Sequence, residues 1–437
     1  MSRWQLVMVC LLCAAGPARA ETVQDALALA WRGNPTLRGQ QATLRATSET
    51  AVQARSGWQP VVTATLDGGY LRAPFDIFDY AAGTGESNDV EALLTVRQPL
   101  YSGGRIADSV RAEETRIKAG RQQFRLVQAQ VFRSVIGAYM DVLRDQDILA
   151  VRRADMTTLA REVAEVTAQY RLGARVTRTD VAQAEAQRRQ AVASRDDASA
   201  RLEASQAAFR AVVGEAPGDL VAPAVLPGLP NTLRGALALT EADGPAVLQS
   251  RLAARAANQD VSTTRAAYFP TISAQGSVGY IGPAAPFRGR GYDREVTGLV
   301  TLTQPLVTGG LIASEVRQAK DHAEAFDQAA DTARRQGMQT VVTAWSQVQR
   351  GLDATRANIA QVRSATVALY GTQLEYGDGL RSTLDVLIAD QTLRAAQISL
   401  AESRHDTIVA EAALLAATGR LDVRLLAQAA GLNRRRR

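Results

Sequence analysis

Apolar and polar residues alternate in four short segments of the chain, and this pattern predicts four β-strands. In residues 61–71 apolar residues and glycine occupy the even positions, whereas threonine and aspartate occupy odd ones. The same division recurs in residues 89–97, 271–280 and 295–303. A period of two is typical of a strand that separates an apolar from a polar environment. With their flanking residues, the strands are expected at about 59–72, 89–100, 269–281 and 294–306.

Two features of these segments favour strands that cross a membrane. Each is about ten residues long, which is the length that spans a bilayer as a tilted strand. Aromatic residues mark the strand ends: Trp58, Tyr70, Tyr101, Tyr268, Phe269 and Tyr280. The alternation alone also fits an ordinary half-buried antiparallel sheet, which remains the alternative.

A seven-residue spacing of apolar and small side chains follows the second strand and predicts a long helix in a coiled coil. The positions are Ile106, Val110, Ile117, Phe124, Val131 and Ala138. Proline is absent from residues 105–213 and 311–437. Sixty continuous helical residues would extend about 90 Å. A shorter helical stretch is expected before each strand pair, at about 28–56 and 238–267.

The sequence contains an internal duplication. "QPLYSGGRIADSV" at 98–110 returns as "QPLVTGGLIASEV" at 304–316. We therefore expect a first repeat at 21–213, a Pro/Gly-rich linker at 214–232, and a second repeat at 233–420, followed by a tail at 421–437. The predicted strand-to-helix junctions contain Pro99, Gly103, Gly104, Pro305, Gly309 and Gly310, and the predicted helix-to-strand junctions contain Pro60 and Pro270.

The two ends of the chain differ from its body. Residues 1–20 combine an early arginine, a short apolar run and Ala18-Arg19-Ala20, the layout of a secretory signal peptide. The sequence has only two cysteines, Cys10 and Cys13, and both lie in this segment. Disulfides and thiolate metal sites are therefore not expected after it is removed. Without the arginines of residues 1–20 and 434–437, the formal charge of +6 disappears, so no nucleic-acid partner is expected.

Four strands cannot form a closed barrel by themselves. Even narrow barrels need about eight strands, and an open sheet edge is not tolerated in lipid. Several copies of the chain must therefore share one barrel, with eight strands from two copies or twelve from three.

Together these motifs make the chain similar to the TolC-like outer-membrane efflux proteins. The similarity covers the duplicated helix–hairpin–long-helix order, both "QPLxxGG" junctions, and the turns "YRLGARVTRTDV" at 170–181 and "YGDGLRSTLDV" at 376–386. It implies a mixed α and β membrane protein: a homotrimer with a shared 12-stranded β-barrel in the outer membrane of a Gram-negative bacterium. A long periplasmic α-helical barrel would continue it.

The resemblance also implies a function. Members of this family conduct substrates passively, in efflux or type I secretion. Besides outer-membrane lipid, the implied partners are a periplasmic adaptor protein and an inner-membrane pump of the ABC or proton-driven type. No enzymatic activity and no cofactor are implied.

No catalytic motif contradicts this function. The two histidines, His322 and His405, each stand alone in a helical pattern, and no P-loop, HExxH, GxSxG or Cys/His cluster occurs. A periplasmic coiled-coil adaptor and a secreted structural protein remain alternatives. Neither would require four strands of membrane length or a full duplication.

The turns between the long helices contain the candidate functional residues. By the resemblance, they form a periplasmic gate in which Tyr376 and Arg381 on one coil bond to Thr179 and Asp180 on its neighbour. Asp385 would be repeated by threefold symmetry into an acidic ring, which favours cations.

Helix capping is the alternative interpretation of the same turns. Asp180 with Gln183 fits an N-cap pair, and Ser382 and Thr383 fit a helix start.

Two features depart from the family pattern. The first turn has one extra residue between its glycine and Asp180, and Ile388 stands where some members have a second aspartate.

Overall fold

The computed structural model describes residues 22–75, 83–173, 176–283 and 293–422. The chain forms two compact units, each assembled from separate stretches of sequence. Unit 1 comprises residues 1–41, 124–245 and 335–437, and unit 2 comprises residues 42–123 and 246–334. The expected signal peptide at 1–20 and the arginine run at 434–437 lie outside the described residues.

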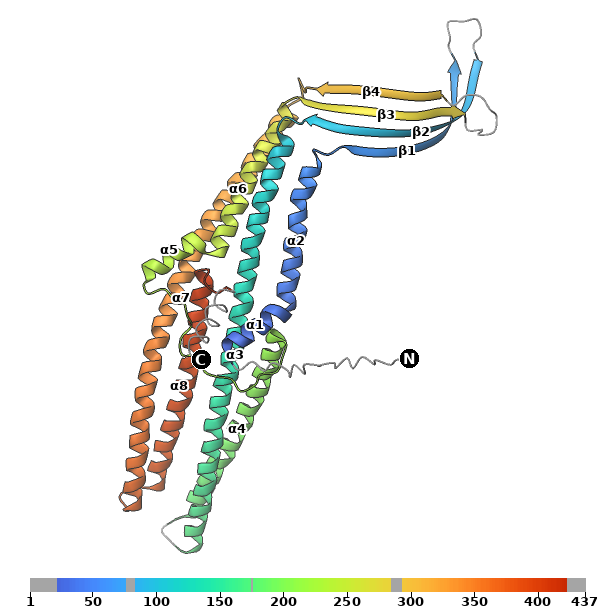
Figure 1. Cartoon of the computed structure of the whole chain (residues 1–437). Helices are drawn as coiled ribbons and strands as arrows, with labels where there is room; N and C mark the ends of the chain where they lie inside the picture. The colour runs from blue at the N-terminus through green and yellow to red at the C-terminus, as the bar shows by residue number, and fades with distance from the viewer. Residues whose placement is uncertain (1–21, 76–82, 174–175, 284–292, 423–437) are drawn as a thin grey trace, which may run out of the picture. The chain divides into compact units, whose positions relative to one another are not determined.

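The order of helices and strands is the same in both halves of the chain (Figure 1). The first half contains α1 (Val23–Gly33), α2 (Pro35–Ser56), β1 (Val61–Phe75), β2 (Gly83–Tyr101), α3 (Arg105–Arg171) and α4 (Arg178–Val213). The second half contains α5 (Leu233–Asp243), α6 (Pro245–Arg265), a 3-10 turn (Ala266–Tyr268), β3 (Thr271–Pro283), β4 (Asp293–Thr303), α7 (Leu311–Gly377) and α8 (Thr383–Ala417).

The helical stretch before each strand pair is two helices, not the single helix expected from the sequence. Pro35 and Pro245 are the first residues of α2 and α6. The residues before them, Asn34 and Gly244, are extended, with ψ of 123° and 117°. A residue that precedes proline is disfavoured in the helical region, whereas proline fits the first helical position. Each proline therefore separates two helices.

The four strands form one antiparallel sheet in unit 2, in the order β1-β2-β3-β4. Even positions pair with even positions across the sheet, as in the row Ala64–Leu94–Val278–Val296. Odd positions form rows such as Thr63–Thr95–Ser277–Thr297. Successive side chains of a strand point to opposite faces. The register therefore confirms one largely apolar and one largely polar face.

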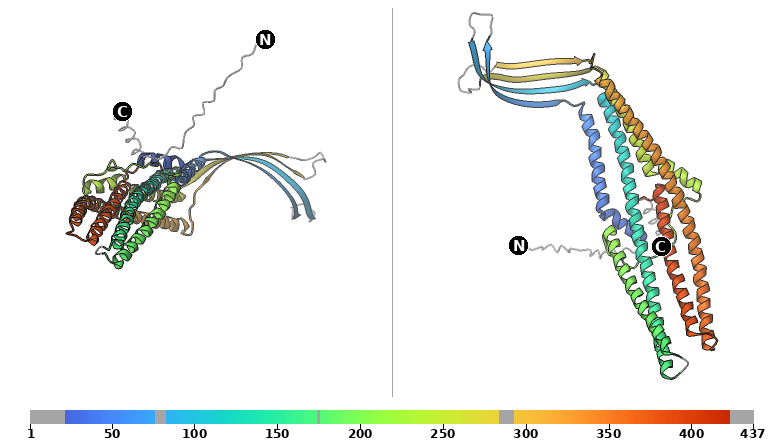
Figure 2. Two further views of the ribbon diagram at one scale, coloured as in Figure 1. Left: turned by 90° about the horizontal axis from the view of Figure 1, so that it is seen from below. Right: turned by 180° about the vertical axis from the view of Figure 1, so that it is seen from behind.

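All four strands extend beyond their alternating segments, and β2 does so most. β1 has 15 residues and β2 has 19, whereas β3 has 13 and β4 has 11. The extra residues of β2 include the run 83–88, "GTGESN", which has no apolar alternation to reveal it. The left view in Figure 2 shows that the sheet is curved.

The long helices confirm the prediction drawn from the absence of proline. α3 and α7 each contain 67 residues, and α4 and α8 contain 36 and 35. α3 and α4 form one helical hairpin, and α7 and α8 form the other (Figure 1). Within the described residues, no helix combines the length and the apolarity needed to cross a membrane.

The segment between the two halves packs against the core of unit 1. The fully buried side chains of Phe132, Tyr139 and Phe209 belong to this core, and Leu226 from the segment joins them. The hydroxyl of Tyr139 donates to the Val221 carbonyl at 2.7 Å and accepts from the Val221 amide at 2.9 Å. The stretch expected as a linker is therefore irregular but fixed in place.

Candidate functional site

The first candidate residues are the glycines where a strand becomes a long helix. Gly103 and Gly104 have φ of 63° and 89°, and Gly309 and Gly310 have φ of 60° and 85°. Residues with a Cβ rarely adopt this left-handed region. The glycines thus allow the chain to bend sharply between strand and helix in both halves.

The glutamine of each "QPL" motif ties this junction to the start of the same hairpin. Gln98 donates from Nε2 to the Trp58 carbonyl at 2.8 Å, and Gln304 donates likewise to the Tyr268 carbonyl at 3.1 Å. Sequence reasoning missed this role. The repetition of glutamine at the same place in both motifs was the available signal.

The turn between α7 and α8 begins with Gly379, at φ 75°, and ends in a capping box. The Ser382 hydroxyl accepts from the Asp385 amide at 3.3 Å. The Asp385 carboxylate in turn accepts from the Ser382 amide at 3.0 Å and from its hydroxyl at 2.8 Å. Asp385 is therefore a helix-start residue whatever else it does.

The turn between α3 and α4 ends in the same capping box. Thr177 is the N-cap residue, and Asp180 accepts from its amide at 2.7 Å and from its hydroxyl at 2.8 Å. Pairing Asp180 with Gln183 as a cap was therefore wrong, because Asp180 is the third helical residue. Asp180 and Asp385 occupy equivalent positions. The extra residue of the first turn lies before the cap.

The remaining gate candidates make contacts within the single chain. The Tyr376 hydroxyl donates to Oε1 of Glu165 on α3 at 3.3 Å, which links the two helical hairpins. Arg381 bonds through Nε to Oε2 of Glu375 at 2.8 Å, within its own hairpin. Thr179 is exposed in the first turn of α4. Among the described residues of one chain, Arg381 is paired with Glu375 and forms no ion pair with Asp180.

Both turns nevertheless line one hollow of unit 1, about 550 Å³ in volume. Asp180 lines it from α4, and Tyr376 and Arg381 line it from the other hairpin. The guanidinium of Arg381 and the carboxylate of Asp180, which come from different turns, thus line the same hollow. This arrangement brings together three of the five predicted gate residues.

The charges at the turns are fixed in their ionised forms. Hydrogen bonds from the Thr177 amide and hydroxyl lower the pKa of Asp180, and those from Ser382 lower the pKa of Asp385. The hydrogen bond to Glu375 raises the pKa of Arg381. These groups can form hydrogen bonds and ion pairs.

Sequence reasoning also missed the two glutamates that accept from the gate residues. Glu375 immediately precedes Tyr376, and Glu165 lies on the other hairpin, 211 residues away in sequence. Only the folded arrangement of the hairpins reveals the second.

The two histidines have different surroundings. His322 is exposed on α7, and His405 lies against carboxylates of α3 and α8. Among the described residues, no group of three or more His, Cys, Asp or Glu side chains is arranged to hold a metal ion.

Known proteins resemble this chain in both sequence and fold. A model of the outer membrane efflux protein family matches residues 26–215 and 237–420. The chain is 30% identical over 405 residues to the outer membrane efflux protein BepC of Brucella suis biovar 1 (strain 1330), covering 92% of this chain and 86% of that protein. It is 25% identical over 420 residues to the outer membrane protein TolC of Escherichia coli (strain K12), covering 93% and 83%.

The fold is also that of a solved membrane protein. A crystal structure from Pseudomonas aeruginosa matches with a TM-score of 0.80 and 20% identity, and the match covers 91% of this chain and 93% of that one. The family match divides into two stretches that follow the two halves of the duplication. The chain therefore belongs to the outer membrane efflux protein family, and it is an outer-membrane channel, not an enzyme.

Proposed function

We propose that three copies of this chain form one conduit, in which a shared 12-stranded barrel continues into a tunnel of long helices. The observation that carries this proposal is the four-stranded sheet with β1 and β4 at its two edges and one largely apolar face. Unpaired strand edges are not tolerated in lipid. Each edge therefore needs a strand from another copy, and three sets of four strands make twelve.

The duplication predicts the register of the contact between β4 of one copy and β1 of the next. β2 and β4 are related by a shift of 206 residues, because "QPLYSGG" begins at 98 and "QPLVTGG" at 304. β1 and β3 are related by a shift of 210, which aligns Pro60 with Pro270 and Tyr70 with Tyr280. Thr95 of β2 pairs with Ser277 of β3 inside the chain. The equivalent contact between chains joins Thr301 of β4 to Asp67 of β1.

Cysteine cross-linking tests this assembly. Because the only native cysteines lie in residues 1–20, the variant Asp67→Cys with Thr301→Cys should give oxidised trimers in outer-membrane fractions. Thr63→Cys with Thr301→Cys is the matched control, since its cysteines share a face but are out of register by four residues. Cross-links in the control alone would refute the register, and a monomer or dimer by mass measurement in mild detergent would refute the trimer.

In this assembly the chain conducts substrate passively and obtains energy from other proteins. An inner-membrane pump, of the ABC or proton-driven type, and a periplasmic adaptor would complete the pathway. Efflux is the proposed process, since the relative of highest identity reported above carries that name. Loss of the chain should raise the internal concentration of a fluorescent efflux dye, and equal dye retention with and without the chain would contradict the proposal.

The hollow lined by both helix turns is the proposed periplasmic gate. Tyr376 links the two hairpins through Glu165 in the single chain. In the trimer, Arg381 would reach Asp180 of a neighbouring copy. Asp385, which is partly exposed and has a lowered pKa, would form the acidic ring.

A further inference from the structure

Two polar layers interrupt the apolar contact between α3 and α8 in unit 1. We call this contact, between residues 141–159 of α3 and 387–408 of α8, the α3–α8 seam. The helices run antiparallel, so the layer near Asp141 and His405 is separated along both helices from the layer near Asp155 and Asp390. Leu159 and Leu387 belong to an apolar cluster at the end of the seam next to the turns.

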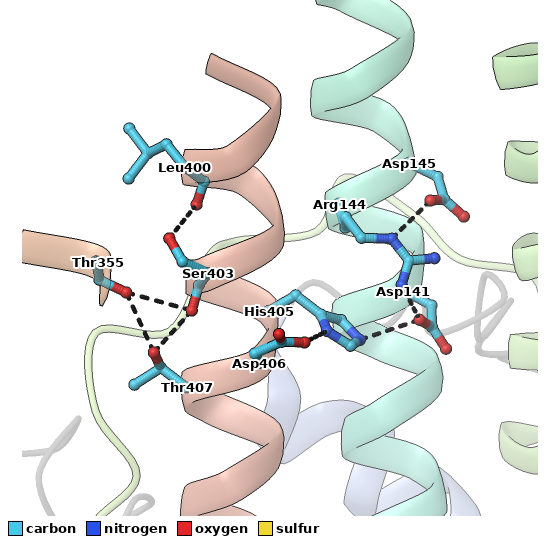
Figure 3. Close-up of polar contacts among 9 residues, drawn as sticks. All are labelled: Asp141, Arg144, Asp145, Thr355, Leu400, Ser403, His405, Asp406 and Thr407. Carbon is cyan, nitrogen blue, oxygen red and sulfur yellow. Dashed lines mark hydrogen bonds and ion pairs between the residues drawn. The ribbon is translucent and has the colours of Figure 1, made fainter. Parts of the chain in front are cut away.

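The first layer holds a histidine between two carboxylates (Figure 3). His405 Nε2 lies 3.0 Å from Oδ1 of Asp141 on α3, and its Nδ1 lies 3.0 Å from Oδ1 of Asp406. A neutral imidazole has one N–H, whereas both ring nitrogens donate in the imidazolium form. Only protonated His405 can therefore satisfy both contacts. Arg144 also bonds to Asp141, at 2.8 Å, and to Asp145, at 2.8 Å.

The second layer holds a buried carboxylate without a bonding partner among the described residues. Asp155 is 8% exposed and borders a hollow of about 250 Å³ between α3, α4 and α8. The nearby Asp390 is bound twice by Arg394, at 3.0 and 3.3 Å. Gln187 Oε1, which lines the same hollow, is buried without a hydrogen bond. When Asp155 is ionised, it thus lies buried near a second carboxylate.

Protons act on the two layers in the same direction. Burial alone would lower the pKa of His405, but its hydrogen bonds to Asp141 and Asp406 outweigh burial and raise that pKa, with Arg144 opposing. Burial, followed by the charge of Asp390, raises the pKa of Asp155, while Arg152 and Arg394 oppose the rise. His405 stabilises the seam at low pH and loses this effect as pH rises through its raised pKa. Asp155 begins to destabilise the seam above its ordinary pKa, about 3.9.

We propose that the α3–α8 seam is a proton-operated latch, in which acidification tightens the contact between the two helical hairpins of one chain. Both layers lie between the same two helices, so their effects on the seam add. As pH rises, the seam loses an ion pair and gains a repulsion.

The duplication makes the α7 and α4 surfaces equivalent to the α3 and α8 surfaces of the seam, and only the seam has the residues of the latch. α7 is related to α3 by a shift of 206 residues, and α8 to α4 by a shift of 205 that aligns the two capping boxes. By these shifts Asp141, Asp155 and His405 correspond to Gln347, Gln361 and Ala200. The pair Asp390–Arg394 does have an equivalent, in Glu185 and Arg189 at 3.9 Å. The α4 and α7 surfaces therefore lack the groups that titrate.

This second step rests on the proposed trimer. There, α4 and α7 of different copies meet in the place that α8 and α3 occupy within one chain. Acid would then tighten the contacts inside each copy and leave those between copies unchanged.

Thermal unfolding of the full-length protein in mild detergent, at several pH values between 5 and 8, tests the latch. The unfolding midpoint should fall as pH rises. His405→Gln should remove most of the fall between pH 6 and 8, and Asp155→Asn should raise the midpoint at pH 7 by a few degrees. His322→Gln, at the exposed histidine, is the control and should retain the wild-type profile. An unchanged profile in both His405→Gln and Asp141→Asn would overturn the latch.

A transplant tests the second step separately. Because Asp406 corresponds to Arg201, the triple change Ala200→His, Arg201→Asp and Gln347→Asp places the histidine and both carboxylates of the first layer on the α4 and α7 surfaces. If these surfaces meet between copies, the fall of the midpoint with pH should steepen. A profile like that of wild type would overturn the assignment to the boundary between copies, while the His405→Gln result, which needs no trimer, would still decide the latch itself.

Discussion

Tyr139 shows how a single buried residue fixes a segment without regular structure. Its hydroxyl both donates to and accepts from the backbone of Val221. Burial raises the pKa of Tyr139 to about 12, so the hydroxyl stays neutral and keeps both roles. Tyr139→Phe should lower the free energy of unfolding by about 1–3 kcal/mol, because two net hydrogen bonds are lost. Urea unfolding measures this loss. Tyr170→Phe, at an exposed tyrosine of the same helix, should change little, and equal losses would contradict the assigned role.

The duplicated junction glycines offer a second test at the scale of one residue. A Cβ added to Gly103 would lie 2.8 Å from both the Ala266 carbonyl oxygen and the Phe269 Cβ, whereas one added to Gly309 meets nothing within 4 Å in this chain. Both glycines have positive φ. Gly309→Ala should therefore cost about 1–2 kcal/mol for the backbone conformation alone, and Gly103→Ala should cost more. Thermal unfolding of the single chain, separated from the trimer in a non-denaturing detergent, compares the two losses.

The variants Gly103→Ala and Gly309→Ala also test the assembly of the trimer. Gly309 corresponds to Gly103, whose crowding comes from the junction before β3. In the proposed trimer, the junction before β1 of a neighbouring copy occupies the equivalent place. Gly309→Ala should then reduce trimer yield as strongly as Gly103→Ala does. A normal yield for Gly309→Ala alone would oppose the proposed contact.

At the scale of helices and strands, the sequence predicted what repeats at short range. The period of two gave the faces of the sheet, and the absence of proline gave the long helices. Pro35 and Pro245 were visible in the sequence as well, and their effect on the preceding residue could have predicted the break in each short helical stretch. The partners Glu165 and Trp58 could not be predicted. Their contacts with Tyr376 and Gln98 depend on how distant segments pack, and no local pattern records that.

The two-faced sheet leads to a prediction about its strands. If the even face contacts lipid, Val62→Arg or Val300→Arg places a charge in the membrane and should cost about 2–4 kcal/mol near the midplane. Thr63→Arg and Thr301→Arg are the matched changes on the polar face and should be tolerated. The yield of heat-modifiable trimer in outer-membrane fractions measures the difference. Equal losses on both faces would show that the assigned orientation is wrong.

For the whole molecule, the helix turns start two helices and, in the proposed gate, would also close the channel. The capping boxes show that Asp180 and Asp385 start α4 and α8. Capping alone does not explain why Tyr376 reaches across to Glu165 or why Arg381 faces the same hollow as Asp180. A lock made of these contacts can therefore be separated from the caps by mutation.

Single-channel conductance in lipid bilayers makes that separation. Tyr376→Phe removes the donor and Glu165→Ala removes the acceptor of the same hydrogen bond, so each should raise the resting conductance, and combining them should add little. Arg381→Ser should raise it further if Arg381 reaches Asp180 of a neighbouring copy. Ser382→Ala is the control, because it weakens the cap at α8 and its hydroxyl bonds to Asp385, which is not part of the lock. It should therefore leave the conductance unchanged.

The acidic ring predicts a different change from the lock. Asp385→Ala removes an ionised carboxylate from the proposed pore, so multivalent cations added on the periplasmic side should block the channel less. The same variant also weakens the cap at α8. Ser382→Ala weakens that cap too, but it retains the Asp385 carboxylate. If the weaker block is caused by the missing charge, multivalent cations should still block the Ser382→Ala channel as they block wild type. The resting conductance should rise in neither variant. Equal loss of block in both would assign the effect to the helix start, and the acidic ring would have to be abandoned.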